Sequence, residues 1–161
     1  MSVPAPEALL EVTDGRVAFP GDRGVVTEAV AGNSFTMARG AMLGVVGESG
    51  SGKSVSALAI MRLLAKESAV ISGSIMFQGQ DLLQIPERTM QGLRGDRIAM
   101  IFQEPMTSLN PSYTVGDQIG EVLVRHRGLN KPDARRETIA LLQRVRIPSP
   151  EQRIDDYPHQ L

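Results

Sequence analysis

A short stretch near position 50 has the residue types and the spacing of a phosphate-binding loop. It reads Gly47-Glu48-Ser49-Gly50-Ser51-Gly52-Lys53-Ser54. This order satisfies the pattern G-x-x-x-x-G-K-[ST], in which glycines let backbone N–H groups close around phosphate oxygens. Lys53 can supply a cation for the β and γ phosphates, and the hydroxyl of Ser54 suits Mg²⁺. The chain holds 14 Arg but only 3 Lys, so a lysine at this position is informative.

Such a loop must lie between a strand and a helix, and the flanking residues predict both. Residues 42–46 form a short apolar run, which is typical of a strand covered on both faces. From 54 to 64 the apolar residues recur at helical spacing, and the positive end of this helix would point at the bound anion. A second buried strand is predicted at 97–102, followed by a polar loop that starts at Gln103.

The remaining segments predict a β layer and further helices. Segments 9–19 and 25–38 have β character, and Pro20-Gly21 separates them, which predicts an antiparallel layer. The pattern then predicts a strand and a return strand within 72–83. It also predicts three helices, at 86–93, 115–127 and 132–145.

Composition bounds the class of protein. The chain has 161 residues, of which 42% are hydrophobic and 22% charged, so it has room for one domain or for part of a larger one. The net charge of −1 gives no support to a broad nucleic-acid interface. Without cysteine there is no disulfide or thiolate metal site, and His126 and His159 lack the spacing of zinc ligands. No apolar run is long enough to span a membrane.

Three strings together resemble the ATP-binding subunits of ATP-binding-cassette (ABC) transporters, specifically the oligopeptide, dipeptide, nickel and glutathione importer group. They are the loop with Val55 after it, the run Ala-Met-Ile-Phe-Gln-Glu-Pro-Met-Thr-Ser-Leu-Asn-Pro at 99–111, and Tyr-Pro-His-Gln-Leu at 157–161. The second string is specific to that group, whereas the first alone indicates only a P-loop ATPase. The resemblance covers about residues 9–161.

The resemblance implies a fold and a domain order. The fold class is α/β, a P-loop NTPase of the ABC nucleotide-binding type that is incomplete, with an N-terminal antiparallel β layer and the start of an α-helical subdomain. The expected division is a disordered N-terminus at 1–8, the β layer and P-loop core at 9–102, and the Q-loop and helical subdomain at 103–161.

The resemblance also implies a site for ATP and Mg²⁺. Residues Gly47 to Val55 would bind the nucleotide, although Val55 stands where many cassettes have a hydroxyl residue, so only its backbone N–H is available. Gln103 resembles the Q-loop glutamine, which positions metal and water, and it would share catalysis with Lys53 and the metal with Ser54. Phe19 looks like the aromatic residue that stacks on adenine. Packing of Phe19 in the core of the β layer is the alternative.

The implied function is that of the ATP-binding component of an importer for peptides or related small solutes. Its partners would be transmembrane permease subunits at the Q-loop region, a second cassette in a nucleotide sandwich and, indirectly, an extracytoplasmic solute-binding protein. No nucleic acid is expected. The location would be peripheral, on the cytoplasmic face of the cell (inner) membrane.

The sequence does not decide whether this chain hydrolyses ATP. The family signature Ser-Gly-Gly, the apolar strand ending in Asp-Glu and the switch histidine are not found in the sequence. The alternative function is therefore a nucleotide-binding fragment or split-gene remnant without turnover. Without the acidic strand, we expect the two predicted buried strands to lack cover and the isolated chain to be marginally stable. Another P-loop NTPase is disfavoured, because the segment Phe-Gln-Glu-Pro at 102–105 argues against it.

Glu48 and a group of basic residues could also be functional, but exposure to solvent explains them as well. Glu48 lies inside the loop, but nothing marks it as a general base, and solvent exposure is the favoured interpretation. A basic group lies on the last two predicted helices and is either a solvated face or a surface for a partner; it consists of Arg125, His126, Arg127, Arg135 and Arg136.

Overall fold

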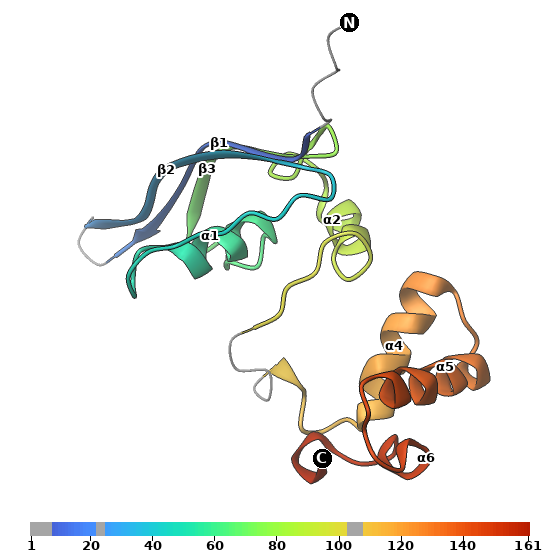
Figure 1. Cartoon of the computed structure of the whole chain (residues 1–161). Helices are drawn as coiled ribbons and strands as arrows, with labels where there is room; N and C mark the ends of the chain where they lie inside the picture. Colours follow the sequence, from blue (N-terminus) through green and yellow to red (C-terminus); the bar gives the residue numbers. More distant parts are fainter. Residues whose placement is uncertain (1–7, 22–24, 103–107) are drawn as a thin grey trace, which may run out of the picture. The chain divides into compact units, whose positions relative to one another are not determined.

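The structure of the chain is a computed structural model that describes residues 8–21, 25–102 and 108–161. The chain divides into two compact units, the first ending at Gln91 and the second beginning at Gly92. The first unit is built on a β-sheet and the second on helices (Figure 1). The fold is thus of the mixed α and β type that the sequence predicts.

A four-stranded antiparallel sheet in the order β2-β1-β3-β4 forms the framework of the first unit. Its strands are β1 (Ala8–Pro20), β2 (Val26–Ala38), β3 (Val70–Phe77) and β4 (Gln80–Asp81). The turn between β3 and β4 uses Gln78 and Gly79 at φ 50° and 79°, as a two-residue hairpin requires. The predicted β layer and the predicted return strand are both confirmed.

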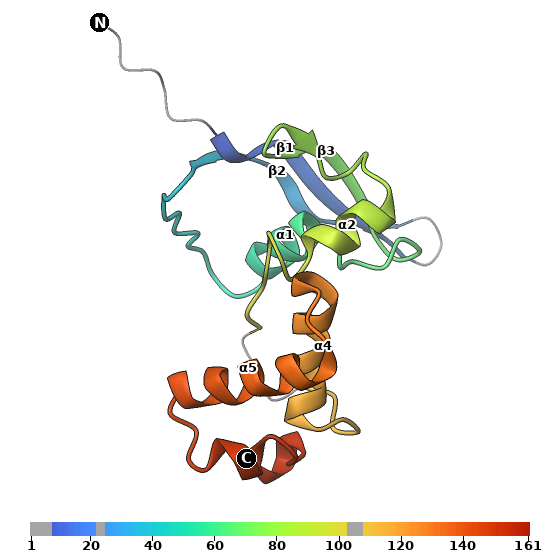
Figure 2. The ribbon, with the colours of Figure 1, turned by 90° about the vertical axis from the view of Figure 1, so that its right-hand side faces the viewer.

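Helix α1 (Lys53–Ile60) covers one face of this sheet (Figures 1 and 2). The core between them is the cluster Val17, Val30, Ala59 and Ala69. The helix ends before residue 64, the predicted end, because Arg62 adopts a positive φ of 50°. The guanidinium of Arg62 then donates to the carbonyl oxygens of Leu82 at 3.0 Å and Ile85 at 2.7 Å. These bonds tie the end of α1 to the segment before α2 (Glu87–Leu93), which matches the short helix predicted at 86–93.

The second unit contains α4 (Val115–Arg127), α5 (Lys131–Arg144), α6 (Pro150–Arg153) and the short 3₁₀ helix η2 (Pro158–Gln160). The side chains of Thr114 and Asn130 cap α4 and α5 by accepting the N–H groups of Asp117 and Asp133, at 3.1 and 2.9 Å. Gly128 ends α4 at φ 66°. Both long helices predicted from the sequence are confirmed, with each end within one residue of its predicted position.

The apolar sides of these helices share one core. Val115, Leu142 and Ile154 are its buried centre, and they bring together α4, α5 and the residue after α6. Backbone bonds support the same arrangement, because the N–H groups of Val115 and Gly116 donate to the carbonyl oxygens of Asp156 and Ile154 at 2.9 and 2.8 Å. The last segment is thereby fixed to the start of α4.

The two predicted buried strands are wrong in this structure. Residues 42–46 are not a strand, and Met42 and Val46 are 97% and 93% exposed. In segment 97–102 only Ile98 pairs, in an isolated bridge with Arg94, and Ile101 is 92% exposed. A strand exists only where a neighbouring strand pairs with it, and no described residue pairs with 42–46 or 99–102. The apolar composition of these segments favours a strand conformation. A strand also needs a second strand to pair with, and composition does not provide one.

The exposure of residues 42–46 can be tested by comparing an exposed valine, Val46, with a buried one, Val17. In this chain, Val46→Ser is expected to change the free energy of unfolding by less than about 0.5 kcal/mol, because the side chain makes little contact. Val17→Ser is expected to lower it by about 2 kcal/mol or more, since Val17 is only 2% exposed. Denaturant unfolding followed by circular dichroism measures both. Similar losses for the two variants would mean that residue 46 is buried.

Candidate functional site

The loop 47–52 leads directly into α1, and two of its glycines have backbone conformations that other residues rarely adopt. Gly50 and Gly52 lie at φ 82° and 87°, and Gly52 is the N-cap of the helix. Gly52 is buried against β2: a Cβ atom there would lie 2.5 Å from the carbonyl oxygen of Ala29. The last glycine of the loop is therefore required both by its φ and by the close approach of the sheet.

The ammonium group of Lys53 lies over the loop and holds it closed. It donates to the carbonyl oxygens of Gly47 and Glu48, both at 2.6 Å, and to the hydroxyl of Ser51 at 3.2 Å. The N–H of Ser51 also donates to the carbonyl of Glu48 at 3.2 Å. The structure thus brings Lys53 to the loop that precedes it, with its three donors directed at neutral oxygen atoms. Phosphate oxygens carry charge and are stronger acceptors than these.

The residues near Lys53 in the sequence differ in their exposure to solvent. Ser54 is exposed in the first turn of α1, where its hydroxyl is accessible to a metal ion. Val55 is partly buried and packs against the cluster beneath α1, so its side chain is structural and only its backbone is available. Glu48 is exposed, as predicted.

Phe19 lies near the end of β1 and is half-buried. Its ring packs against the same core cluster as Val55. This contact supports the core interpretation of Phe19. Stacking on a base therefore stays a prediction for this residue. Gln103, the other residue predicted for catalysis and metal binding, lies outside the described residues, and so do its neighbours 104–107.

Sequence reasoning missed two polar residues, of which Ser56 bonds to the loop and Asn33 bonds to Ser56. The hydroxyl of Ser56 donates to the carbonyl oxygen of Gly52 at 3.0 Å and accepts from the amide of Asn33 at 3.1 Å. A serine four residues after a helix N-cap can bond back to that carbonyl, so Ser56 had a signal in the sequence. Asn33 had none, because its contact depends on how β2 lies beside α1.

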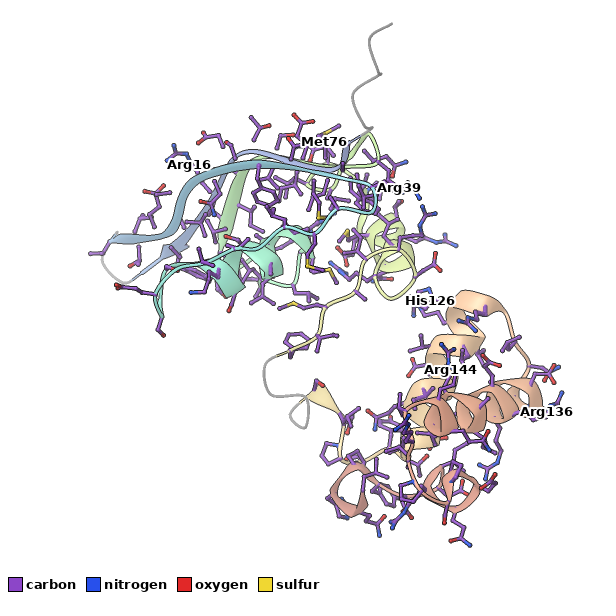
Figure 3. The ribbon with its side chains drawn as sticks, viewed as in Figure 1. Arg16, Arg39, Met76, His126, Arg136 and Arg144 are labelled. Atoms are coloured by element: carbon purple, nitrogen blue, oxygen red, sulfur yellow. The ribbon has the colours of Figure 1, made fainter. Side chains whose placement is uncertain are left out.

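The basic group on α4 and α5 is largely neutralised within its own unit. Arg127 pairs with Glu137 at 3.3 Å, and Arg136 pairs with Asp133. Arg135 donates to both carboxylate oxygens of Asp155 at 2.7 Å, which lowers the pKa of that carboxyl group. Figure 3 labels His126 and Arg136 on this helical unit. The pairs support the interpretation of this group as a solvated face.

Comparison with known proteins agrees with the loop and the fold. The family model described as ABC transporter matches residues 30–161, so the chain belongs to this family. The "Probable peptide ABC transporter ATP-binding protein y4tR" of Sinorhizobium fredii is 47% identical over 99% of this chain and 48% of its own length. The "Dipeptide transport ATP-binding protein DppD" of Escherichia coli is 50% identical over 96% and 47%. The "Oligopeptide transport ATP-binding protein OppD" of Salmonella typhimurium is 49% identical over 94% and 45%.

The chain spans about half the length of the curated relatives it matches. Among solved structures, "Dimeric structure of a post-hydrolysis state of the ATP-binding cassette MJ0796 bound to ADP and Pi" aligns with a TM-score of 0.78 at 18% identity, covering 94% of this chain and 62% of that one. "Structure of a bacterial Atm1-family ABC exporter with ATP bound" aligns at 0.54 and 23%, covering 99% and 27%. Both support the ABC ATPase fold.

In the part of the chain that the structure describes, every helix is too short or too polar to cross a lipid bilayer.

Proposed function

We propose that this chain binds ATP with Mg²⁺ through the loop 47–55, as part of the ATP-binding component of an importer for peptides or related small solutes. The observation that carries the proposal is the loop itself, in which Lys53 lies over a turn of positive-φ glycines at the start of α1. The positive end of the helix and the ammonium group favour the same anion.

The residues present fit a nucleotide and its metal. The positive-φ glycines leave the loop without side chains at its tightest points, so backbone N–H groups can approach phosphate oxygens. Lys53 would exchange its carbonyl partners for the β and γ phosphates, and the exposed hydroxyl of Ser54 would hold Mg²⁺, which neutralises phosphate charge when bound. Gln103 would complete the metal and water contacts. Phe19 would stack on the base.

The transport role rests on the relatives. Proteins named for dipeptide and oligopeptide transport are about half identical to this chain over nearly all of its length. By analogy, its partners would be permease subunits at the Q-loop region, a second cassette and, through the permease, a solute-binding protein. The proposed location is the cytoplasmic face of the cell (inner) membrane.

Nucleotide binding by the 161-residue chain tests the proposal. We expect saturable binding of MgATP and MgADP by titration calorimetry, with weaker binding when EDTA removes Mg²⁺. Phosphate release is not expected from this chain under either function, because the family signature, the strand ending in Asp-Glu and the switch histidine are not found in its sequence. Binding is therefore the result that both the transport ATPase and the nucleotide-binding chain without turnover require. A folded chain that binds neither nucleotide contradicts both.

A further inference from the structure

A polar link outside the loop motif connects the sheet to the phosphate-binding loop. Ser56 donates twice to the carbonyl oxygen of Gly52, through its N–H at 2.8 Å and its hydroxyl at 3.0 Å. The side-chain amide of Asn33 donates to the same hydroxyl oxygen at 3.1 Å. Asn33 lies on β2 and Ser56 on α1, so the link joins two elements that the sequence separates by twenty-three positions.

The link has a fixed direction. A serine hydroxyl has one hydrogen, and that of Ser56 points to the carbonyl oxygen of Gly52. Toward Asn33, the hydroxyl oxygen of Ser56 can therefore only accept a hydrogen bond. Residue 33 must therefore be a donor. An aspartate of the same shape could only accept, and it would compete with Gly52 for the hydroxyl hydrogen.

The backbone around Asn33 is irregular in a way that fixes its place. Gly32 precedes it at φ 103°, and Asn33 pairs with Gly15 where the β1–β2 register shifts on both sides. The same strand also contacts the loop at Ala29, against which Gly52 packs. β2 therefore reaches Gly52 in two ways, directly by close packing at Ala29 and indirectly from Asn33 through Ser56 of α1.

The planarity of the peptide group connects this link to phosphate binding. The carbonyl oxygen of Gly52 and the N–H of Lys53 belong to one peptide plane and point in opposite directions. Two bonds from Ser56 fix the carbonyl toward the body of α1, so the N–H of Lys53 is aimed away from the helix body, toward the loop. Tilting this plane would turn that N–H away from an anion at the helix start.

We propose that Asn33 is a positioning residue for the phosphate-binding loop, acting through Ser56 on the Gly52–Lys53 peptide group. The proposal rests on the proposed function, since it assigns a residue to that same site. It predicts that the donor at position 33 matters for nucleotide affinity more than for the stability of the sheet, because Asn33 itself is exposed.

The test compares MgADP affinity in variants of the full chain. Asn33→Asp is expected to weaken binding about fivefold, the size of one lost hydrogen bond in the site. Ser34→Asp adds the same charge at the next residue of β2, where the carboxylate can still accept the N–H of Asp14 that the Ser34 hydroxyl now accepts. We expect this control to change affinity less than about twofold.

Variants of Ser56 give a second, independent comparison. Ser56→Ala is expected to weaken MgADP binding as much as Asn33→Asp does, and the double variant no further, because both break one link. Ser56→Thr keeps the hydroxyl and should restore affinity. The backbone amide resonance of Lys53 should shift in Asn33→Asp before nucleotide is added, which general destabilisation would not cause. If Asn33→Asp does not fold, Ser56→Ala against Ser56→Thr carries the same comparison.

The outcomes separate the two proposals. Equal affinities for Asn33→Asp and Ser34→Asp, with a wild-type chain that binds MgADP, overturn the positioning role alone. The same holds if Ser56→Ala binds as the wild type does. A folded wild-type chain without MgADP binding overturns the proposed function, and the positioning role with it.

Discussion

Lys53→Ala is expected to weaken MgATP binding by about a hundredfold, which corresponds to about 3 kcal/mol lost from charged hydrogen bonds to phosphate. In the structure this ammonium already donates to three oxygen atoms of the loop, two of them carbonyls at 2.6 Å. An alanine side chain supplies neither these bonds nor a cation for the incoming phosphate. Titration calorimetry with MgATP measures the effect.

Two controls make this result specific. Lys66→Ala removes an exposed lysine of the same unit that lies outside the loop, and it should leave affinity unchanged. Lys53→Arg keeps the charge, but a planar guanidinium has a different shape from the ammonium that reaches Gly47 and Glu48, so it should restore only part of the affinity. Equal binding by the wild type and Lys53→Ala, both folded, would reject the role of this residue.

Gly73→Ala is expected to lower the free energy of unfolding by about 4 kcal/mol, a large part of the stability of a small domain. Gly73 lies within β3 at φ 91°, where it crosses the irregular part of β1. A Cβ atom there would overlap the carbonyl oxygen of Asp14 and lie 2.7 Å from that of Thr13. Both obstacles are backbone atoms, so the sheet itself would have to move.

Gly79→Ala is the matched control for this prediction. Gly79 also has a positive φ, 79°, but nothing lies within 4 Å of its added Cβ. Its expected loss is about 1 kcal/mol, from backbone conformation alone. Denaturant unfolding of the two variants separates the steric part from the conformational part. Similar losses for both would show that β1 and β3 do not approach each other closely at Asp14.

The sheet matters for the site because its strands pack against the end of the loop and against α1. β2 packs on Gly52 and reaches Ser56, and the cluster under α1 includes Val17 of β1 and Ala69 before β3. A change that loosens these strands would therefore alter the loop without touching it.

Local chemistry explains what the sequence determined by itself. The loop at 47–54 is defined by its own glycines, lysine and serine, and α4 and α5 are defined by caps within three residues of their starts. The β3–β4 turn likewise follows from Gln78 and Gly79. Each of these features is specified by residues close together in the chain, so its pattern can be read without knowing the fold.

Contacts between distant segments were decided only by the tertiary structure. Residues 42–46 and 97–102 have the composition of buried strands, yet Met42 and Ile101 are exposed, because pairing needs a neighbour that composition does not specify. Phe19 packs on the cluster beneath α1, and Asn33 reaches Ser56 across twenty-three positions. Since such contacts depend on where two elements meet in space, no local pattern records them.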